Sequence, residues 1–250
     1  LPRSLQAMSM TTRLAGDIPA LLVRPPDAGD QPVPFLLWMH GRTANKEFDP
    51  GRYLRLARAG IGSVAIDLPP HGERATDQAS DTKHVLDTIE HAAAELDDVF
   101  SAIGRHGGFD LSHAAIGGMS LGGMVALVRL GRAHPFKAAL LEATSGWWRD
   151  QRGRQFHDPD ATAALDPSMH LEGWRDVPVL AIHSKLDEWV SWDGQRKFLD
   201  ALRTQSKNPD LIEQLVFEET GAAHEHLGFG RCSNEARLRG IEFLTSTIGR

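Results

Sequence analysis

The chain has 250 residues, of which 41% are hydrophobic and 24% are charged, a composition that excludes a disordered or fibrous protein. The net charge of -6 comes without a basic block, which argues against a nucleic-acid-binding protein. No apolar run approaches the roughly 20 residues that cross a bilayer, and the single cysteine, Cys232, cannot form an intramolecular disulfide. We therefore expect one globular domain over residues 1–250, in the reducing environment of the cytoplasm, with no nucleic-acid or membrane partner.

Short apolar runs alternate with helical patterns along most of the chain. The N-terminal part indicates a hairpin, with strands at about residues 6–13 and 20–23. The alternation that follows predicts an α/β fold, in which a mostly parallel sheet carries helices on both faces. The expected strands of this sheet are residues 35–39, 62–66, 114–118, 138–141, 177–182 and 215–218.

Three helical patterns stand out between these strands. Residues 82–103 carry apolar side chains at spacings of three and four, which predicts one buried stripe. Residues 120–130 are apolar on nearly every side, so this helix should lie in the middle of the molecule. A last helix carries Leu238, Ile241 and Leu244.

The segment 144–174 breaks the alternation, because it is long, polar and rich in turn residues between two expected strands. Connections of this length are usually functional or mobile. A solvated excursion is one interpretation. We favour a small cap over a pocket, since the adjacent Trp147 and Trp148 are costly to leave in water. Both are candidate substrate-binding residues.

The run Gly118-Met119-Ser120-Leu121-Gly122 is a G-x-S-x-G motif between an expected strand and an expected helix. A serine on such a tight turn has strained backbone angles, and glycines two residues either side avoid collisions with neighbouring backbone. The helix N-terminus would stabilise a developing negative charge beside the hydroxyl. A glycine-rich turn that only packs a helix onto a strand is the alternative, but the context favours Ser120 as a nucleophile.

With this motif the chain resembles the α/β-hydrolase superfamily, and in particular small bacterial esterases related to the dienelactone hydrolases. FLLWMHGRTANKE is similar to the family's strand and HG oxyanion loop, AIDLPPHGER to its D-x-x-x-HG-x-R stretch, and DEWVS after AIHSKL to its acid-bearing loop. The resemblance implies an α/β-hydrolase fold and an oxyanion hole built by the backbone N–H groups of Arg42 and Leu121. Two departures are Ser120 where many dienelactone-type enzymes have cysteine, and HGRT in place of HGGG.

A serine hydroxyl needs a histidine base and a carboxylate that orients it, and in this fold they follow in the order Ser, Asp or Glu, His. Asp187 and Glu188 both qualify as the acid, and the resemblance to the family's H-G-x-x-D selects Asp187. Trp189, directly after them, is a third candidate substrate-binding residue. Glu188 is then interpreted as a rim carboxylate.

The base is expected in the stretch TGAAHEHLGF after the final strand, which contains His224 and His226. Gly221-Ala222-Ala223-His224 fits the family's G-x-x-H placement, so the resemblance favours His224, with His226 as a neighbouring or surface residue. In a helical turn, residues two apart point about 200° apart, and only one could face Ser120. In an extended loop both could.

The remaining polar residues receive structural interpretations. His40 and His71 lie in turns beside glycine and His183 ends a strand, so we expect hydrogen-bonded scaffold roles, and Asp67 is expected to form a turn. A further hypothesis is that the Arg42 side chain reaches the pocket and favours acidic substrates. No H-E-x-x-H motif or cysteine cluster exists, so no metal site and no cofactor are expected.

These residues together predict a serine carboxylesterase that cleaves a small-molecule ester through an acyl-enzyme, with Ser120, His224 and Asp187 as the triad. A thioesterase and a peptidase of the prolyl-oligopeptidase kind share this chemistry, and the peptidase is less expected because no propeller precedes the catalytic part. A non-catalytic ligand receptor on the same fold is the alternative from a different class.

Overall fold

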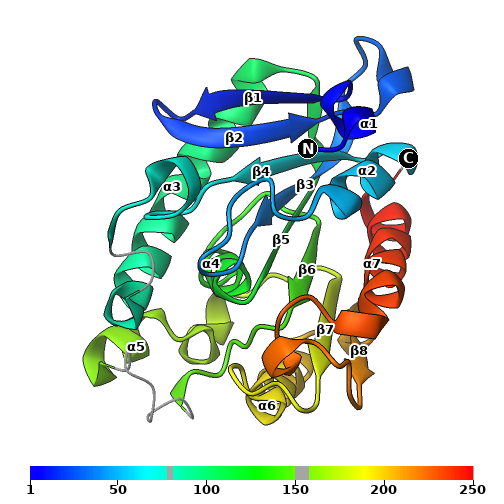
Figure 1. Cartoon of the computed structure of the whole chain (residues 1–250). Helices are drawn as coiled ribbons and strands as arrows, with labels where there is room; N and C mark the ends of the chain where they lie inside the picture. The colour runs from blue at the N-terminus through cyan, green and yellow to red at the C-terminus, as the bar shows by residue number, and fades with distance from the viewer. Residues whose placement is uncertain (78–80, 150–157, 250) are drawn as a thin grey trace.

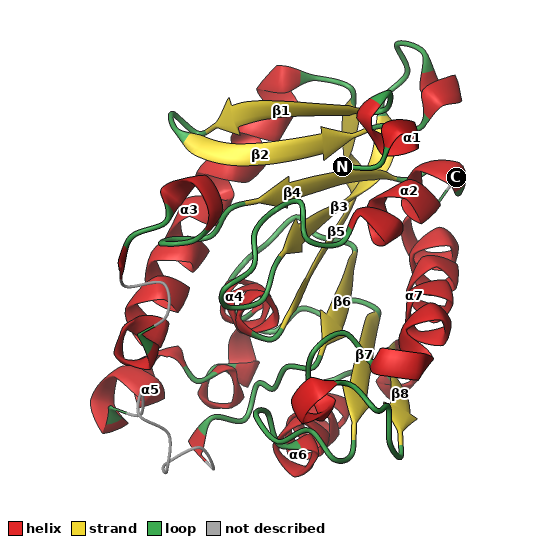
Figure 2. Cartoon of the chain, in the orientation of Figure 1, coloured by secondary structure: helices red, strands yellow, loops and turns green. Residues whose placement is uncertain are grey.

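The structure, a computed structural model, describes residues 1–77, 81–149 and 158–249. Its centre is an eight-stranded sheet in the order β1-β2-β4-β3-β5-β6-β7-β8, drawn in Figure 1 and, by secondary structure, in Figure 2. The strands are β1 (Ser9–Leu14), β2 (Ile18–Val23), β3 (Val33–Met39), β4 (Gly62–Ile66), β5 (Phe109–Met119), β6 (Ala138–Glu142), β7 (Val179–Ser184) and β8 (Ile212–Phe217). Each strand expected from the sequence has a counterpart here, and the N-terminal hairpin is formed by β1 and β2.

The sheet is antiparallel at one edge and parallel elsewhere. β1 pairs with β2, and β2 with β4, in antiparallel registers. From β4 through β3, β5, β6 and β7 to β8 every pair is parallel. The carboxyl ends of the parallel strands therefore meet along one edge, where ligand sites of open α/β sheets usually form.

Helices cover both faces of the sheet (Figure 1). They are α1 (Arg3–Gln6), α2 (Pro50–Arg58), α3 (Val85–His106), α4 (Leu121–Leu130), α5 (Pro159–Leu165), α6 (Trp192–Gln205) and α7 (Ser233–Ile248). Local signals start several of them: Asp49 caps α2 by accepting from the Arg52 N–H, and Pro50 occupies its first turn. Among the described residues, no helix is both long and apolar enough to span a bilayer.

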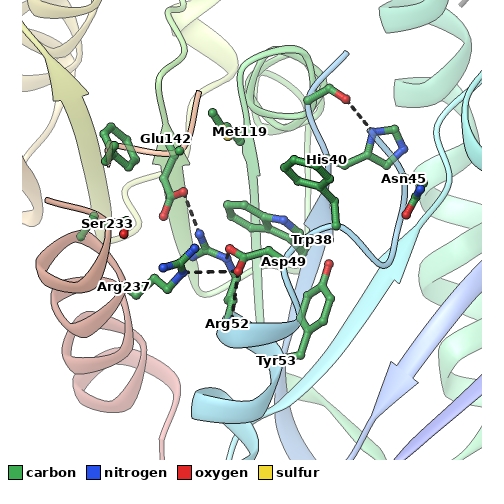
Figure 3. A pocket seen from close by; sticks show the side chains of 15 residues that line it. Trp38, His40, Asn45, Asp49, Arg52, Tyr53, Met119, Glu142, Ser233 and Arg237 are labelled. Atoms are coloured by element: carbon green, nitrogen blue, oxygen red, sulfur yellow. Dashed lines mark hydrogen bonds and ion pairs between the residues drawn. The ribbon is translucent and has the colours of Figure 1, made fainter. Parts of the chain in front are cut away.

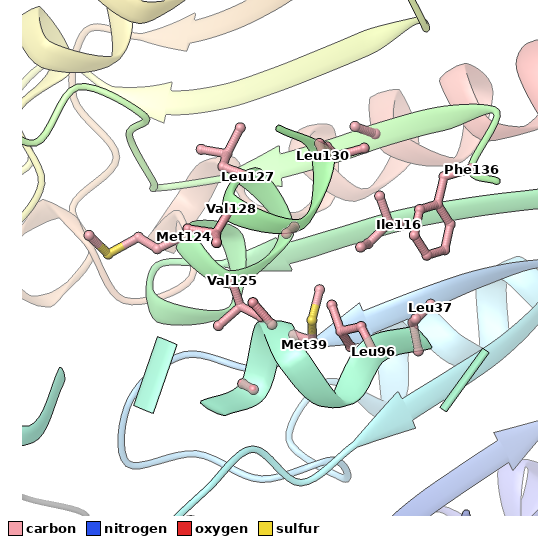
Figure 4. Packing of buried hydrophobic residues seen from close by; sticks show 14 of the residues in the cluster. Leu37, Met39, Leu96, Ile116, Met124, Val125, Leu127, Val128, Leu130 and Phe136 are labelled. Carbon is pink, nitrogen blue, oxygen red and sulfur yellow. The ribbon is translucent and has the colours of Figure 1, made fainter. Parts of the chain in front are cut away.

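Two hydrophobic clusters lie on opposite faces of the sheet. Alternate residues of β3 supply both: Phe35, Leu37 and Met39 face the helices α3, α4 and α6, while Leu36 and Trp38 face α2 and α7. Figure 4 shows α4 packed against side chains of β3, β5 and α3. All ten residues of α4 are buried, as its all-round apolar pattern predicts.

The C-terminal helix α7 buries only part of the apolar set named from the sequence. Of Leu238, Ile241 and Leu244 only Leu244 is buried, whereas Leu238 is 47% exposed. The buried face is instead formed by Ala236, Gly240, Phe243, Leu244 and Ile248. Small residues such as Gly240, which packs against Leu140, let the helix approach the sheet and are invisible to a search for large apolar side chains.

The expected cap corresponds to the connection between β6 and β7. Within 144–174, residues 150–157 lie outside the described residues, and the remainder contains α5, which packs against α3. Asp166, which follows α5 and is 2% exposed, accepts hydrogen bonds from the backbone N–H groups of Trp148 and Arg149 and so ties the start of the segment to the end of α5. That the segment covers a substrate pocket stays a prediction.

Candidate active site

Ser120 occupies a strained turn between β5 and α4. Its φ of 51° and ψ of −115° lie outside the regions that side-chain-bearing residues normally adopt. The turn is held by hydrogen bonds from the Ser120 N–H to the Glu142 carbonyl and from the Thr144 hydroxyl to the Ser120 carbonyl, at 2.9 Å each. Strain of this kind persists only where the surroundings enforce it and is concentrated at functional sites.

The two glycines of the motif are required by close backbone approach. A Cβ on Gly118 would lie 2.3 Å from the carbonyl carbon of Gly122, and a Cβ on Gly122 would lie 2.2 Å from the carbonyl oxygen of Met39. Neither position can hold a larger residue without moving a strand or α4. The steric interpretation of G-x-S-x-G is therefore confirmed.

A chain of hydrogen bonds joins Ser120, His226 and Asp187. The Ser120 hydroxyl lies 2.9 Å from Nε2 of His226, and Nδ1 of His226 lies 2.8 Å from Oδ2 of Asp187. With the proton on Nδ1, the imidazole donates to Asp187 and accepts from the serine hydroxyl. This is the geometry in which a histidine can take a proton from a serine.

Asp187 is held in one orientation by the loop after β7. Its Oδ1 accepts from the backbone N–H groups of Trp189, at 2.8 Å, and Val190, at 2.7 Å. Its side chain is 0% exposed, so Oδ2 is directed at His226 rather than at solvent. The choice of Asp187 over Glu188 agrees with this arrangement.

The choice of His224 is wrong: the structure brings His226, and not His224, to Ser120. The side chain of His224 is 52% exposed and its Nδ1 donates to Oε2 of Glu188 at 2.9 Å. His224 and Glu225 both have left-handed backbones, with φ of 55° and 48°. Two successive left-handed residues form neither of the two geometries expected from the sequence, a helical turn or an extended loop. The histidine that reaches Ser120 is therefore His226, two residues further along the chain.

Glu225, between the two histidines, fixes this loop and was missed from the sequence. Its Oε2 accepts from the Ser184 hydroxyl and from the Thr220 N–H, both at 2.7 Å. Burial raises the pKa of Glu225, but the hydrogen bonds from Ser184 and Thr220 outweigh it and bring the pKa to about 2. No sequence signal separates this carboxylate from an ordinary surface glutamate, because its partners come from β7 and the start of the same loop.

The loop after β3 lies directly against Ser120. A Cβ built on Gly41 would be 3.7 Å from the Ser120 Cβ, and Arg42 follows as a half-buried residue. Leu121 is the first residue of α4, so its N–H has no acceptor within the helix. Arg42 and Leu121 therefore lie beside Ser120, where the two residues of the oxyanion hole are expected. Their action as oxyanion donors, and a role for the Arg42 side chain toward acidic substrates, stay predictions.

His40 holds this loop as a neutral imidazole. Its Nε2 accepts from the Leu68 N–H at 3.1 Å, and its Nδ1 donates to the Gly41 carbonyl at 2.8 Å. Burial lowers the pKa of His40 to about 4, more than the hydrogen bond to Gly41 raises it. The scaffold interpretation of His40 is confirmed, and that of His183 agrees, since its Nε2 donates to the Val190 carbonyl at 2.9 Å.

Asp67 does more than form a turn. It is 0% exposed and accepts from the Lys46 backbone at 2.8 Å, the Lys46 ammonium at 3.0 Å and the Glu73 N–H at 3.0 Å. Lys46, itself 4% exposed, belongs to the loop that carries Arg42. The buried Lys46–Asp67 pair therefore clamps this loop to the end of β4.

The three candidate substrate-binding tryptophans have different surroundings. The prediction for Trp148 is wrong, because this residue is 0% exposed and its indole N–H donates to the Ser145 carbonyl inside the core. Trp189 is half-buried and lies between the two histidines, with ring centroids 4.9 Å from His226 and 5.0 Å from His224. For Trp147, half-buried beneath the Arg149 guanidinium, substrate binding stays a prediction.

No group of three or more metal-ligating side chains gathers within residues 1–77, 81–149 and 158–249. The site consists of four loops that follow β3, β5, β7 and β8, and it presents a serine, an imidazole and a buried carboxylate in hydrogen-bonded sequence. This sheet and this placement of the three residues define the molecule as an α/β-hydrolase.

The comparison with known families is more specific. The chain belongs to the prolyl oligopeptidase family, whose model matches residues 87–248, and the protein is accordingly a serine hydrolase. It is 26% identical to Esterase YjfP of Escherichia coli (strain K12) over 212 residues, which cover 78% of this chain and 85% of that protein.

Solved structures agree with the fold. TT1662 from Thermus thermophilus is 26% identical, with a TM-score of 0.75 and coverage of 95% of this chain and 97% of that one. A putative dienelactone hydrolase from Klebsiella pneumoniae has a TM-score of 0.71 at 19% identity, covering 95% and 98% of the two chains. The acylaminoacyl peptidase of Pyrococcus horikoshii has a TM-score of 0.78 at 16% identity, but the match covers 97% of this chain and 42% of the peptidase.

Proposed function

We propose that this protein is a serine carboxylesterase that hydrolyses small esters through an acyl-enzyme. The observation that carries the proposal is the hydrogen-bonded sequence Ser120, His226, Asp187, in which the imidazole and carboxylate are buried and the serine hydroxyl is reachable from a half-buried position. The 26% identity with Esterase YjfP supports an ester as the substrate class.

Acylation follows from the positions of these atoms. As the Ser120 oxygen forms a bond to the ester carbonyl carbon, its proton passes to Nε2 of His226, 2.9 Å away. The Nδ1–H bond to Asp187 keeps the imidazole oriented and stabilises the imidazolium. The N–H groups of Arg42 and Leu121 would hold the oxyanion. When the tetrahedral intermediate collapses, the C–O bond to the alcohol breaks and His226 returns the proton to the leaving alkoxide.

Deacylation uses the same groups in the opposite order. A water molecule gives its proton to His226 while its oxygen attacks the acyl carbon, and the ester bond to Ser120 then breaks. The serine oxygen recovers the proton and the carboxylic acid leaves. Water-assisted release needs no group beyond those that acylation uses.

The proposal is tested by the loss of activity in Ser120→Ala. Hydrolysis of p-nitrophenyl acetate should fall by about 10⁴-fold or more, because the nucleophile is removed. A fluorophosphonate probe should label the wild-type protein at Ser120 and leave Ser120→Ala unlabelled. Retained turnover in Ser120→Ala, with wild-type-like circular dichroism, would overturn the mechanism. Absence of both labelling and turnover in the wild type would favour a ligand receptor on this fold.

Peptide-bond hydrolysis is the second candidate function, and the match to the prolyl oligopeptidase family favours it. The two activities differ in the leaving group, since an amine must be protonated before it can depart. Matched acyl p-nitrophenyl esters and p-nitroanilides should separate them: an esterase cleaves the ester alone at a useful rate, whereas a peptidase also releases p-nitroaniline.

A further inference from the structure

A small cavity of about 70 Å³ lies next to the turn that carries Ser120, on the face of the sheet covered by α2 and α7 (Figure 3). Met119 and Gly41, which immediately precede Ser120 and Arg42, line its inner wall, and Gly228 lines it two residues after His226. Phe48, 71% exposed, lies at its rim. The cavity is thus adjacent to all three loops that would surround a bound ester carbonyl.

Four charged side chains line the cavity, two of each sign. The Arg52 guanidinium donates to Oε2 of Glu142 at 2.7 Å and to Asp49 at 3.0 Å, and Arg237 lies 3.3 Å from the second oxygen of Asp49 (Figure 3). The set therefore carries no net charge when all four groups are ionised. An additional charged group would leave this set unbalanced.

One polar atom of this cluster lacks a partner. Glu142 is 3% exposed, and its Oε1 has no hydrogen bond to any of the described residues. Leaving a buried carboxylate oxygen unsatisfied is costly. The other charged groups of the lining are paired with each other, so Oε1 is the oxygen of this cluster that is left without a partner among the described residues.

A hydroxyl is the group that fits this atom in either protonation state. Burial raises the pKa of Glu142, and the Arg52 guanidinium offsets only part of that rise. An ionised Oε1 accepts a hydrogen bond and a protonated one donates it, and a hydroxyl can do both, whereas an ammonium can only donate. The cavity is small, at about 70 Å³, which favours a short guest.

We propose that this cavity is a substrate subsite that receives a short hydroxyl-bearing arm of the ester, with Glu142 as its hydrogen-bond partner. The proposal rests on the proposed function and narrows its substrate class to short esters that carry a hydroxyl group. An isosteric methyl group would displace water without replacing its hydrogen bonds, and such displacement weakens binding.

The test compares two ester pairs in which a hydroxyl replaces a methyl group. Ethyl glycolate and ethyl propionate differ in the acyl part, while 2-hydroxyethyl acetate and propyl acetate differ in the alcohol. For each protein, kcat/KM of the hydroxyl ester is divided by kcat/KM of the methyl ester, both measured by acid release. Because the intrinsic reactivity of the two esters is the same for every protein, a difference in this ratio between variants reports the enzyme's preference alone. In one of the two pairs, which identifies the arm, the ratio in Glu142→Met should fall about tenfold below the wild-type ratio.

Three further variants make this comparison specific. Glu142→Gln, which keeps a side-chain oxygen, should retain most of the wild-type ratio. Ala236→Val enlarges a residue that lines the cavity and should lower the ratio without touching any charge, which covers the case that Glu142→Met does not fold. Ala102→Val, a matched change in the buried face of α3 and remote from the cavity, should leave the ratio as it is. Equal ratios in all of these proteins would overturn the subsite.

Binding of the same esters to Ser120→Ala, measured by isothermal titration calorimetry, separates the two proposals. If Ser120→Ala binds the hydroxyl ester more tightly than its methyl counterpart, and Ser120→Ala/Glu142→Met does not, the subsite is supported. If the wild type nevertheless cleaves neither ester, only the esterase proposal fails. Rapid hydrolysis with equal affinities within each pair has the opposite meaning: the esterase proposal stands and the subsite is refuted.

Discussion

At the scale of single residues, the side chain of His226 is 1% exposed between Asp187 and Ser120, whereas 52% of the His224 side chain is open to solvent. A general base needs both a partner that fixes its tautomer and a reach of about 3 Å to the proton it takes. His226 has both. His224 has a carboxylate partner in Glu188 rather than the serine, and this exposed contact is of the kind that contributes little.

Separate alanine substitutions of the two histidines should therefore have very different effects. His226→Ala removes the proton acceptor of Ser120, and kcat for p-nitrophenyl acetate should fall by about 10⁴-fold or more. His224→Ala removes an exposed pair and a ring that stacks on Trp189, and kcat should change little. Steady-state kinetics of both purified variants check this. A dead His224→Ala beside an active His226→Ala would contradict the structure of the loop.

At the scale of elements, the sequence predicted the strands well because buried parallel strands are short, nearly continuous apolar runs. It did not single out α2 and α6. Both helices are amphipathic, but beside apolar residues such as Leu56 on α2 and Phe198 on α6 their buried faces include Arg52 and Gln195. The tertiary contacts that bury these polar residues cannot be seen in a local window of sequence.

The difference between local sequence patterns and tertiary contacts also explains which residues of the site were predictable. Ser120 and Asp187 directly follow the ends of predicted strands or lie a few residues beyond them, so the motif and the strand together locate them. His226 depends on the left-handed backbone at His224 and Glu225, which is fixed by contacts to Ser184 on another strand. The sequence therefore narrowed the base to two histidines, and only the packed loop distinguishes them.

The loop after β3 offers a test at this scale, through the buried pair of Lys46 and Asp67. Lys46→Met leaves the Asp67 carboxylate buried with two backbone donors and no countercharge from this lysine. Removing one partner of a buried pair typically costs about 3–5 kcal/mol. We expect a loss of about 3 kcal/mol in the free energy of unfolding by urea, together with a lower kcat, because the loop carries Arg42.

Lys185→Met is the matched control, since the Lys185–Glu218 pair is exposed on both sides. Exposed pairs contribute about 0–1 kcal/mol, so this variant should unfold near the wild-type urea concentration and keep its activity. If Lys46→Met lost stability while its kcat stayed at the wild-type value, the clamp would be structural only and would not position the loop.

At the scale of the whole molecule, four of the buried histidines have a lowered pKa. They are His40, His71, His134 and His183. Burial is the largest cause in every case, and for His134 the charges of Arg175 and Arg129 add to it. The folded protein therefore holds these side chains neutral at pH values where the unfolded chain binds protons.

This proton linkage sets how stability depends on pH. An ordinary histidine titrates near pH 6.5, and His40 in the fold titrates at about 4, so between these values the unfolded state binds more protons and stability decreases as the pH falls. For His40 alone the loss of stability between about pH 7 and about pH 5 is on the order of 2 kcal/mol.

Urea unfolding at both pH values should show a fall in the free energy of unfolding of at least this size in the wild type. His40→Gln, which still offers an acceptor to the Leu68 N–H, should be less stable than the wild type at neutral pH and lose about 2 kcal/mol less on acidification. An identical pH dependence in the two proteins would mean that His40 is able to accept a proton in the fold, which its bond from Leu68 opposes.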